Sequence, residues 1–138
     1  MSGIVVDASV AAKWFLTEEN SNAATRLLHL EHALLGPELL MVETAAAIVR
    51  QFRKGGLAAE PAARLLADVH GLFSARSVTL VSDSALLPRA ESIAIQLRHP
   101  LQDCLYVACA ESAGAELVTT DAALIKRAAP QFPFVRSL

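Results

Sequence analysis

Cysteine is scarce in this sequence, and so is any excess of positive charge. The two cysteines, Cys104 and Cys109, are five positions apart, so on a helix they point to different faces. With no Cys-x-x-Cys pair and no histidine partners, they predict neither a disulfide nor a zinc site. We expect them to be small core residues. The formal net charge is −2, which does not favour a nucleic-acid partner at first sight.

Long hydrophobic runs are also missing, although 54% of the residues are apolar and the mean hydropathy is +0.41. No stretch approaches the ~18 uncharged apolar residues of a membrane span. The apolar segment before Asp7, "GIVV", is too short for a signal peptide. We therefore expect a cytoplasmic protein without a membrane segment. The length predicts one domain, residues 1–138, with a sizeable core.

Short apolar segments alternate with long stretches rich in alanine and leucine. The segments "GIVV", "VTLV", "ELVT" and "FPFV", which end at positions 6, 81, 119 and 135, are strand candidates. The predicted helices are 8–16, 21–33, 37–54, 59–73, 84–99, 101–113 and 121–128. This alternation predicts an α/β domain with a mainly parallel sheet that is covered on both faces.

Three aspartates follow predicted strands, and each admits two interpretations. Asp7 follows the first strand, Asp83 the second and Asp121 the third. In an open parallel sheet, ligands bind at the carboxyl ends of the strands. Aspartate is also a preferred helix N-cap, and for any one of the three the cap is the better interpretation.

Two further carboxylates interrupt apolar helix faces. Glu43 lies in "PELLMVETAAAIVRQF", where its neighbours three and four positions away are apolar and none is a cation. A buried, unpaired carboxylate is rare, so Glu43 needs a distant cation, a proton or a metal ion, unless it reaches solvent at the edge of the apolar face. Asp103 lies in "HPLQDCLYVACAE", near a predicted helix start where an acidic residue is favourable anyway.

If the strand-end and helical carboxylates meet at one edge of the sheet, they repel one another. Such a cluster persists when it is protonated or neutralised by cations, and oxygen ligands suit Mg²⁺ or Mn²⁺. The chemistry that such a site supports is phosphoryl transfer.

Four segments resemble those of the PIN domain in order and spacing, and most closely those of VapC-type toxins of toxin–antitoxin pairs. The segments are "IVVDASVAAKWF", "ELLMVETAAAIVR", "HPLQDCLYVACAE" and "LVTTDAAL". The resemblance covers essentially the whole chain and implies a three-layer α/β/α sandwich. It also implies that Asp7, Glu43, Asp103 and Asp121 are the catalytic, metal-binding acids.

Ser9 and Thr119 match hydroxyl positions that often support the site in this family. One departure is Thr44-Ala45, where many members have a small polar pair containing asparagine. The resemblance gives no role to Asp83, which we expect to be a helix cap.

The resemblance implies an Mg²⁺-dependent endoribonuclease that leaves a 5′-phosphate product. It also implies a homodimer and a cognate antitoxin of the VapB type. We expect a disordered antitoxin tail to fold onto residues 8–33 and 37–54, onto exposed apolar side chains such as Trp14, Phe15 and Leu16. Without the four proposed ligands the charge is +2, and six basic residues are candidate RNA contacts: Lys13, Arg50, Arg53, Lys54, Arg98 and Lys126.

Two alternatives compete with this prediction. A receiver or phosphatase domain also carries an aspartate after its first strand, but it usually has an acidic pair there and a strand-end lysine, whereas "VVDASV" has a lone aspartate. A catalytically silent PIN-like interaction module would bind a partner without cleaving RNA. Four intact acids argue against it.

Overall fold

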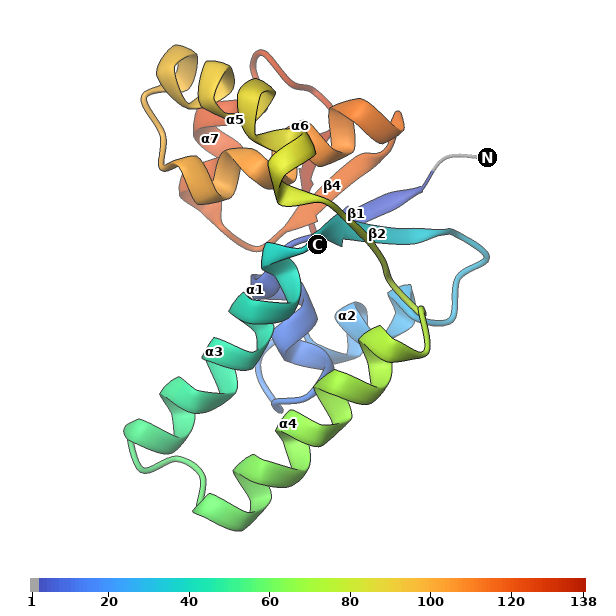
Figure 1. The fold of residues 1–138 in the computed structure, drawn as a ribbon, viewed down its shortest axis with the longest axis vertical. Helices are drawn as coiled ribbons and strands as arrows, with labels where there is room; N and C mark the ends of the chain where they lie inside the picture. The colour runs from blue at the N-terminus through green and yellow to red at the C-terminus, as the bar shows by residue number, and fades with distance from the viewer. Residues whose placement is uncertain (1–2) are drawn as a thin grey trace.

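A computed structural model describes residues 3–138, and within this range five strands form one parallel sheet between two helical layers (Figure 1). The strands are β1 (Ile4–Val6), β2 (Leu34–Pro37), β3 (Thr79–Val81), β4 (Glu116–Thr119) and β5 (Val135–Ser137). Their order is β3-β2-β1-β4-β5, and every neighbouring pair is parallel. The predicted three-layer α/β/α architecture is therefore confirmed.

The helices divide into two groups on opposite faces of the sheet (Figure 1). One group contains α5 (Asp83–Leu97), α6 (Leu101–Ala113) and α7 (Ala122–Ala128). The other contains α1 (Ala8–Ala11), the 3₁₀ helix η1 (Ala12–Trp14), α2 (Ser21–Leu27), α3 (Leu39–Arg53) and α4 (Ala59–Ser74). Helices α3 and α4 pack together and extend away from the sheet as a hairpin.

The core lies where β1 meets α6. All three residues of β1 are buried, as expected for a central parallel strand that is covered on both faces. Residues 104–110 of α6 are all buried too, because this helix packs against β1, β2 and β4 on one side and against α5 on another. A helix that is apolar on every side belongs in a core. Both predicted core cysteines lie in this segment with free thiols.

Strand β2 is the main correction to the predicted fold. Its residues, Leu-Leu-Gly-Pro, contain no β-branched side chain, and Pro37 was expected in the first turn of a helix. Instead Pro37 ends the strand, and α3 begins at Leu39. A Cβ on Gly36 would lie 2.5 Å from Leu40 Cδ2, so glycine allows α3 to fold back directly onto the strand. The pairing of β2 with β1 and β3 overrides its weak strand propensity.

The segment after α1 also differs from its prediction. The expected helix 8–16 is α1 followed by η1, and the expected helix 21–33 ends at Leu27. Trp14, Phe15 and Leu16 were expected to be exposed, but they are half-buried and pack against the core. The indole Nε1 of Trp14 donates to the carbonyl of Ala24 at 2.8 Å, which fixes the tryptophan against α2.

The start of α3 is fixed by a reciprocal pair of side-chain hydrogen bonds to α5. Asp83 Oδ1 accepts from the backbone N–H of Leu39 at 3.1 Å, and Glu38 Oε1 accepts from the backbone N–H of Asp83 at 3.2 Å. Asp83 was expected to cap its own helix, but Ser82 does so, and Asp83 caps α3 instead. This contact determines where α3, which carries Glu43, leaves the sheet.

In the described part of the chain, no helix combines the length and the apolar composition that crossing a bilayer requires.

Replacing Asp83 with alanine should lower the free energy of unfolding by about 1 kcal/mol, because the first turn of α3 loses its capping acceptor. Asp83→Asn keeps an acceptor oxygen and should lose less. Asp68→Ala is the matched control, since Asp68 is exposed on α4. Urea unfolding measures all three variants, and equal effects of Asp83→Ala and Asp68→Ala would show that the cap adds no stability.

Candidate active site

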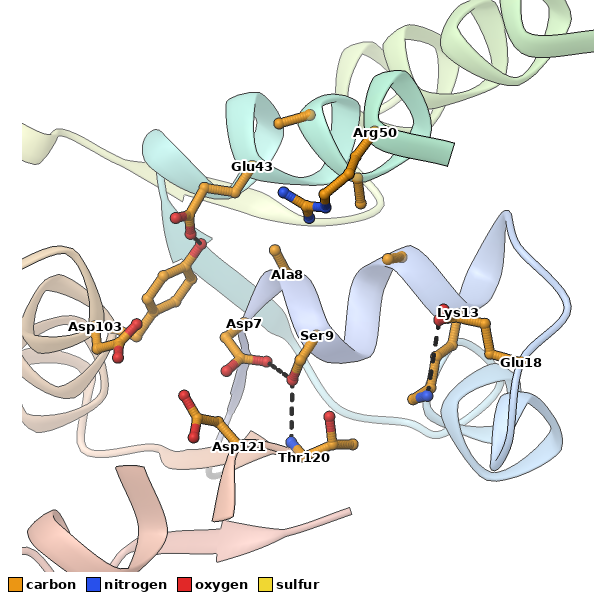
Figure 2. Close-up of a pocket in the computed structure, with 14 residues that line it drawn as sticks. Asp7, Ala8, Ser9, Lys13, Glu18, Glu43, Arg50, Asp103, Thr120 and Asp121 are labelled. Atoms are coloured by element: carbon orange, nitrogen blue, oxygen red, sulfur yellow. Dashed lines mark hydrogen bonds and ion pairs between the residues drawn. The ribbon is translucent and has the colours of Figure 1, made fainter. Parts of the chain in front are cut away.

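A cavity of about 440 Å³ opens beside the carboxyl ends of β1 and β4. Its lining includes all four predicted carboxylates: Asp7, Glu43, Asp103 and Asp121. Asp7 and Asp121 follow the neighbouring strands β1 and β4, whereas Glu43 comes from α3 and Asp103 from α6 (Figure 2). The fold therefore brings together on one surface four acids that lie far apart in the sequence.

Asp7 is the most enclosed of these carboxylates, with 8% of its surface exposed. Its Oδ1 accepts from the Ser9 hydroxyl at 2.5 Å and from the backbone N–H of Val10 at 3.3 Å. Its Oδ2 accepts from the Thr119 hydroxyl at 2.5 Å. Asp7 is thus the N-cap of α1 and a cavity residue at once, so the two interpretations of this residue are compatible.

Ser9 and Thr119 join the ends of β1 and β4 through Asp7. The Ser9 hydroxyl accepts from the backbone N–H of Thr120 at 3.0 Å, and the Thr119 hydroxyl accepts from the backbone N–H of Asp121 at 3.0 Å. Because both hydroxyls accept a backbone hydrogen bond, their own protons are directed at Asp7. The orientation of the carboxylate is therefore determined on both of its oxygens.

Burial raises the pKa of Asp7 from its ordinary value of 3.8 to about 6. The hydrogen bonds from Ser9, Thr119 and Val10 oppose this rise because they favour the ionised form, whereas the charge of Asp103 adds to it. The ionised cavity is therefore costly for the folded chain. A cation bound there would remove this cost.

Glu43 is half-buried and has a partner that the sequence did not reveal. The hydroxyl of Tyr106 on α6 donates to Glu43 Oε1 at 2.6 Å. We had expected a cation, a proton, a metal ion or solvent, and the partner in the structure is a neutral phenol. Burial, together with the hydrogen bond and charge of Glu43, raises the pKa of Tyr106 far above its ordinary value, so the phenol stays a donor.

Asp103 and Asp121 each have one oxygen engaged elsewhere. Asp103 Oδ2 lies 2.7 Å from Nε2 of His99, whose side chain is 8% exposed. The imidazole of His99 is therefore largely enclosed and contacts the Asp103 carboxylate. Asp121 Oδ1 accepts from the backbone N–H groups of Ala123 and Leu124 and caps α7.

The donors that line the acidic part of the cavity are all oxygens, which suits a hard divalent cation. In residues 3–138, no three carboxylate, imidazole or thiol groups lie close enough together to enclose one ion. This spacing is compatible with Mg²⁺, which keeps several waters and is usually held by one or two carboxylates. The donor set therefore fits Mg²⁺ or Mn²⁺ better than zinc, which prefers nitrogen and sulfur ligands.

Three further residues differ from what their sequence context suggested. Tyr106 lies three positions after Asp103, so a helical pattern puts both on one face, but nothing in the sequence pairs it with Glu43. Glu18 follows no predicted strand and lies on no apolar helix face, yet it lines the cavity and pairs with Lys13 at 3.7 Å. Thr44 turns away from the cavity and donates to the carbonyl of Leu40.

Comparison with known proteins agrees with this geometry. A family model described as the PIN domain matches residues 4–130. The chain is 31% identical over 124 residues to Ribonuclease VapC3 from Pyrobaculum aerophilum, an alignment that covers 90% of this chain and 93% of that protein. These matches confirm the resemblance inferred from the four sequence segments.

Two solved structures share the fold. The crystal structure of PAE2754 from Pyrobaculum aerophilum matches with a TM-score of 0.67 and 25% identity, over 91% of this chain and 79% of that one. A toxin–antitoxin complex from Klebsiella pneumoniae matches with a TM-score of 0.64 and 13% identity, over 97% of this chain and 96% of that one. The second likeness concerns the fold alone.

Asp7→Asn should stabilise the metal-free protein in a pH-dependent way. Well below pH 4 the wild-type carboxyl is protonated in both folded and unfolded chains, so it costs nothing. Between about pH 4 and pH 6 the unfolded chain ionises while the folded chain keeps its proton, so the folded state loses up to roughly 3 kcal/mol of stability, and above about pH 6 this loss stays constant. The advantage of Asp7→Asn in unfolding free energy should therefore grow between about pH 4 and pH 6, as measured by urea unfolding in EDTA. A difference that does not change with pH would contradict the raised pKa.

Tyr106 is the only tyrosine in the sequence, so its ionisation is visible in the ultraviolet spectrum. In the folded protein, tyrosinate absorbance should not appear near pH 10, where it appears in the urea-unfolded chain. Glu43→Gln removes the neighbouring charge, so ionisation should begin at lower pH than in the wild type. Glu91→Gln, an exposed change on α5, is the control. Ordinary ionisation of folded wild-type protein would contradict the Glu43–Tyr106 contact.

Proposed function

Because the chain belongs to the PIN domain family, we propose that it is an Mg²⁺-dependent endoribonuclease and the toxin of a toxin–antitoxin pair. The observation that carries the proposal is the convergence of Asp7, Glu43, Asp103 and Asp121 on one cavity. The similarity to Ribonuclease VapC3 over 90% of this chain supports RNA as the substrate. We propose further that residues 1–138 act as a single cytoplasmic PIN domain, in keeping with two free thiols.

One or two of the four carboxylates would bind Mg²⁺, or Mn²⁺ in its place, directly, and the others would contact the waters that the ion keeps. When bound, the ion would supply an activated water and neutralise charge on the phosphate. Ser9 and Thr119 keep Asp7 oriented toward the cavity, and Tyr106 leaves the second oxygen of Glu43 available. Hydrolysis then adds water across the bond between phosphorus and the 3′-oxygen. The products are a 5′-phosphate and a 3′-hydroxyl.

The partner of this toxin would be an antitoxin of the VapB type. The Klebsiella pneumoniae neighbour was solved as a toxin–antitoxin complex, which supports a partner of this kind. The half-buried Trp14, Phe15 and Leu16 offer less surface for it than we expected. Within 37–54, however, α3 exposes Val42 by 65%, Val49 by 42% and Phe52 by 45%. We propose that the antitoxin tail covers this apolar row on α3.

A homodimer is the second assembly that we propose. The chain is more apolar than an average soluble domain, and part of that excess lies on its surface. On α5, the side chain of Ile95 is 82% exposed and that of Leu87 is 36% exposed. Exposed apolar patches of this kind are typical of interfaces. Leu87 and Ile95 do not line the cavity, so pairing through them would leave its lining residues available to RNA.

Purified protein should cleave single-stranded RNA in Mg²⁺, and EDTA should stop the reaction. Asp7→Asn and Asp121→Asn should each lower the rate by more than about 100-fold, because each removes charge that holds the cation. Asp68→Asn is the matched control, since this carboxylate is exposed on α4 and lies outside the cavity. End-group analysis should find 5′-phosphates. RNA that stays intact in both Mg²⁺ and Mn²⁺, with an antitoxin still bound, would favour the silent interaction module.

A further inference from the structure

The cavity has a basic end as well as an acidic one. Lys13 of η1 and Arg50 of α3 line it together with the four carboxylates. Figure 2 shows the guanidinium of Arg50 extending into the cavity opposite Ala8, on the side away from Asp121. Of the six basic residues considered as RNA contacts, these two line the cavity and the other four do not.

Lys13 is already neutralised within the chain. Its Nζ donates to the carbonyl of Glu19 at 2.7 Å and lies 3.7 Å from Glu18 Oε1. Only 12% of its side chain is exposed. Lys13 therefore ties the loop after η1 to the cavity wall, and most of its charge is offset there.

Arg50 is in a different position. Its side chain is exposed, and no carboxylate among residues 3–138 forms an ion pair with it. By contrast, Arg64, Arg89 and Arg136 each pair with a glutamate. An unpaired guanidinium in a cavity lined by five carboxylates has no obvious structural function. It does carry two parallel donors in the geometry that a phosphate accepts.

The location of Arg50 relates it directly to the acidic end. It follows Glu43 by seven residues, so both project from the same face of α3, roughly 10 Å apart along the helix axis. The lining between them consists of small side chains, Ala46 and Ala47 on α3 facing Ala8 and Ala12. These alanines leave room for a ribose–phosphate chain to run from the acids to Arg50.

We propose that the basic end of the cavity is a binding subsite for a second RNA phosphate, adjacent to the one that is cleaved, and that Arg50 contacts it. This inference rests on the proposed ribonuclease function. It defines the substrate as a single strand with at least two phosphates. A dinucleoside monophosphate carries the scissile phosphate alone, so it lacks the group that Arg50 holds.

Arg50→Gln tests the subsite, with Arg53→Gln as the matched control. Arg53 is exposed on the same helix and lies outside the cavity. Arg50→Gln should lower kcat/KM on an oligonucleotide by about 10- to 100-fold, and reduce the slope of log KM against log salt by about 0.7. Arg50→Lys keeps the charge but not the paired donors, so its kcat/KM should lie between those of Arg50→Gln and the wild type. On a dinucleoside monophosphate, all four proteins should cleave equally slowly.

Neutral phosphate analogues locate the contact. Each test oligonucleotide carries one methylphosphonate and a 2′-deoxy sugar at that linkage. The reference oligonucleotide carries the same 2′-deoxy sugar with an ordinary phosphate. In the wild type, neutralising the phosphate next to the cleaved one should cost about as much as Arg50→Gln does. In Arg50→Gln the same analogue should add no further loss, whereas in Arg53→Gln the full loss should remain.

The outcomes separate this inference from the function on which it rests. If the wild type cleaves no RNA, the proposed function fails. If the wild type cleaves and Arg50→Gln behaves like Arg53→Gln, the subsite is wrong even though the ribonuclease stands. The subsite would also be wrong if the loss caused by Arg50→Gln disappeared when the methylphosphonate replaced the scissile phosphate. Arg50 would then act at the reaction centre. Unchanged cleavage with weaker antitoxin binding would assign Arg50 to the protein interface instead.

Discussion

The hydrogen bonds that converge on Asp7 are the constraint on which the cavity depends. A buried carboxylate at the end of β1 is tolerated because Ser9, Thr119 and the N-terminus of α1 donate to it. The same two hydroxyls accept from the backbone of the turn after β4. One acid therefore links the carboxyl ends of the neighbouring strands β1 and β4. The position of Asp121, which begins the next helix, follows from that link.

The helical acids depend on a separate set of contacts. Glu43 is located by the start of α3, where Asp83 and Glu38 exchange hydrogen bonds and Gly36 lets the helix fold back onto β2. Its carboxylate is then held by Tyr106, a residue of the buried helix that also carries Asp103. The two sides of the cavity are thus joined by one phenol hydrogen bond. A neutral donor suits this place, because a cation there would compete with a metal ion for the carboxylate.

Much of this arrangement could be predicted from the sequence, because Asp7 and Asp121 follow strands of a parallel sheet. The carboxyl ends of such strands are where ligands bind. Strand-end aspartates and acids on apolar helix faces indicated one edge of the sheet, and all of those residues except Asp83 line one cavity. Strand β2 escaped prediction because Leu-Leu-Gly-Pro has no local strand signal and acquires its conformation from its neighbours. Tyr106 escaped for the same reason, since a partner 63 positions away leaves no trace in local spacing.

Charge within the cavity gives the two ends different tasks. The net charge of −2 conceals four carboxylates gathered at one end, which repel an RNA phosphate, and an unpaired guanidinium at the other, which attracts one. A strand held by Arg50 alone would bring its next phosphate up against ionised acids. That approach becomes favourable once a divalent cation lies between the carboxylates and the phosphate. Substrate and metal are therefore expected to bind with positive coupling, since each offsets charge that disfavours the other.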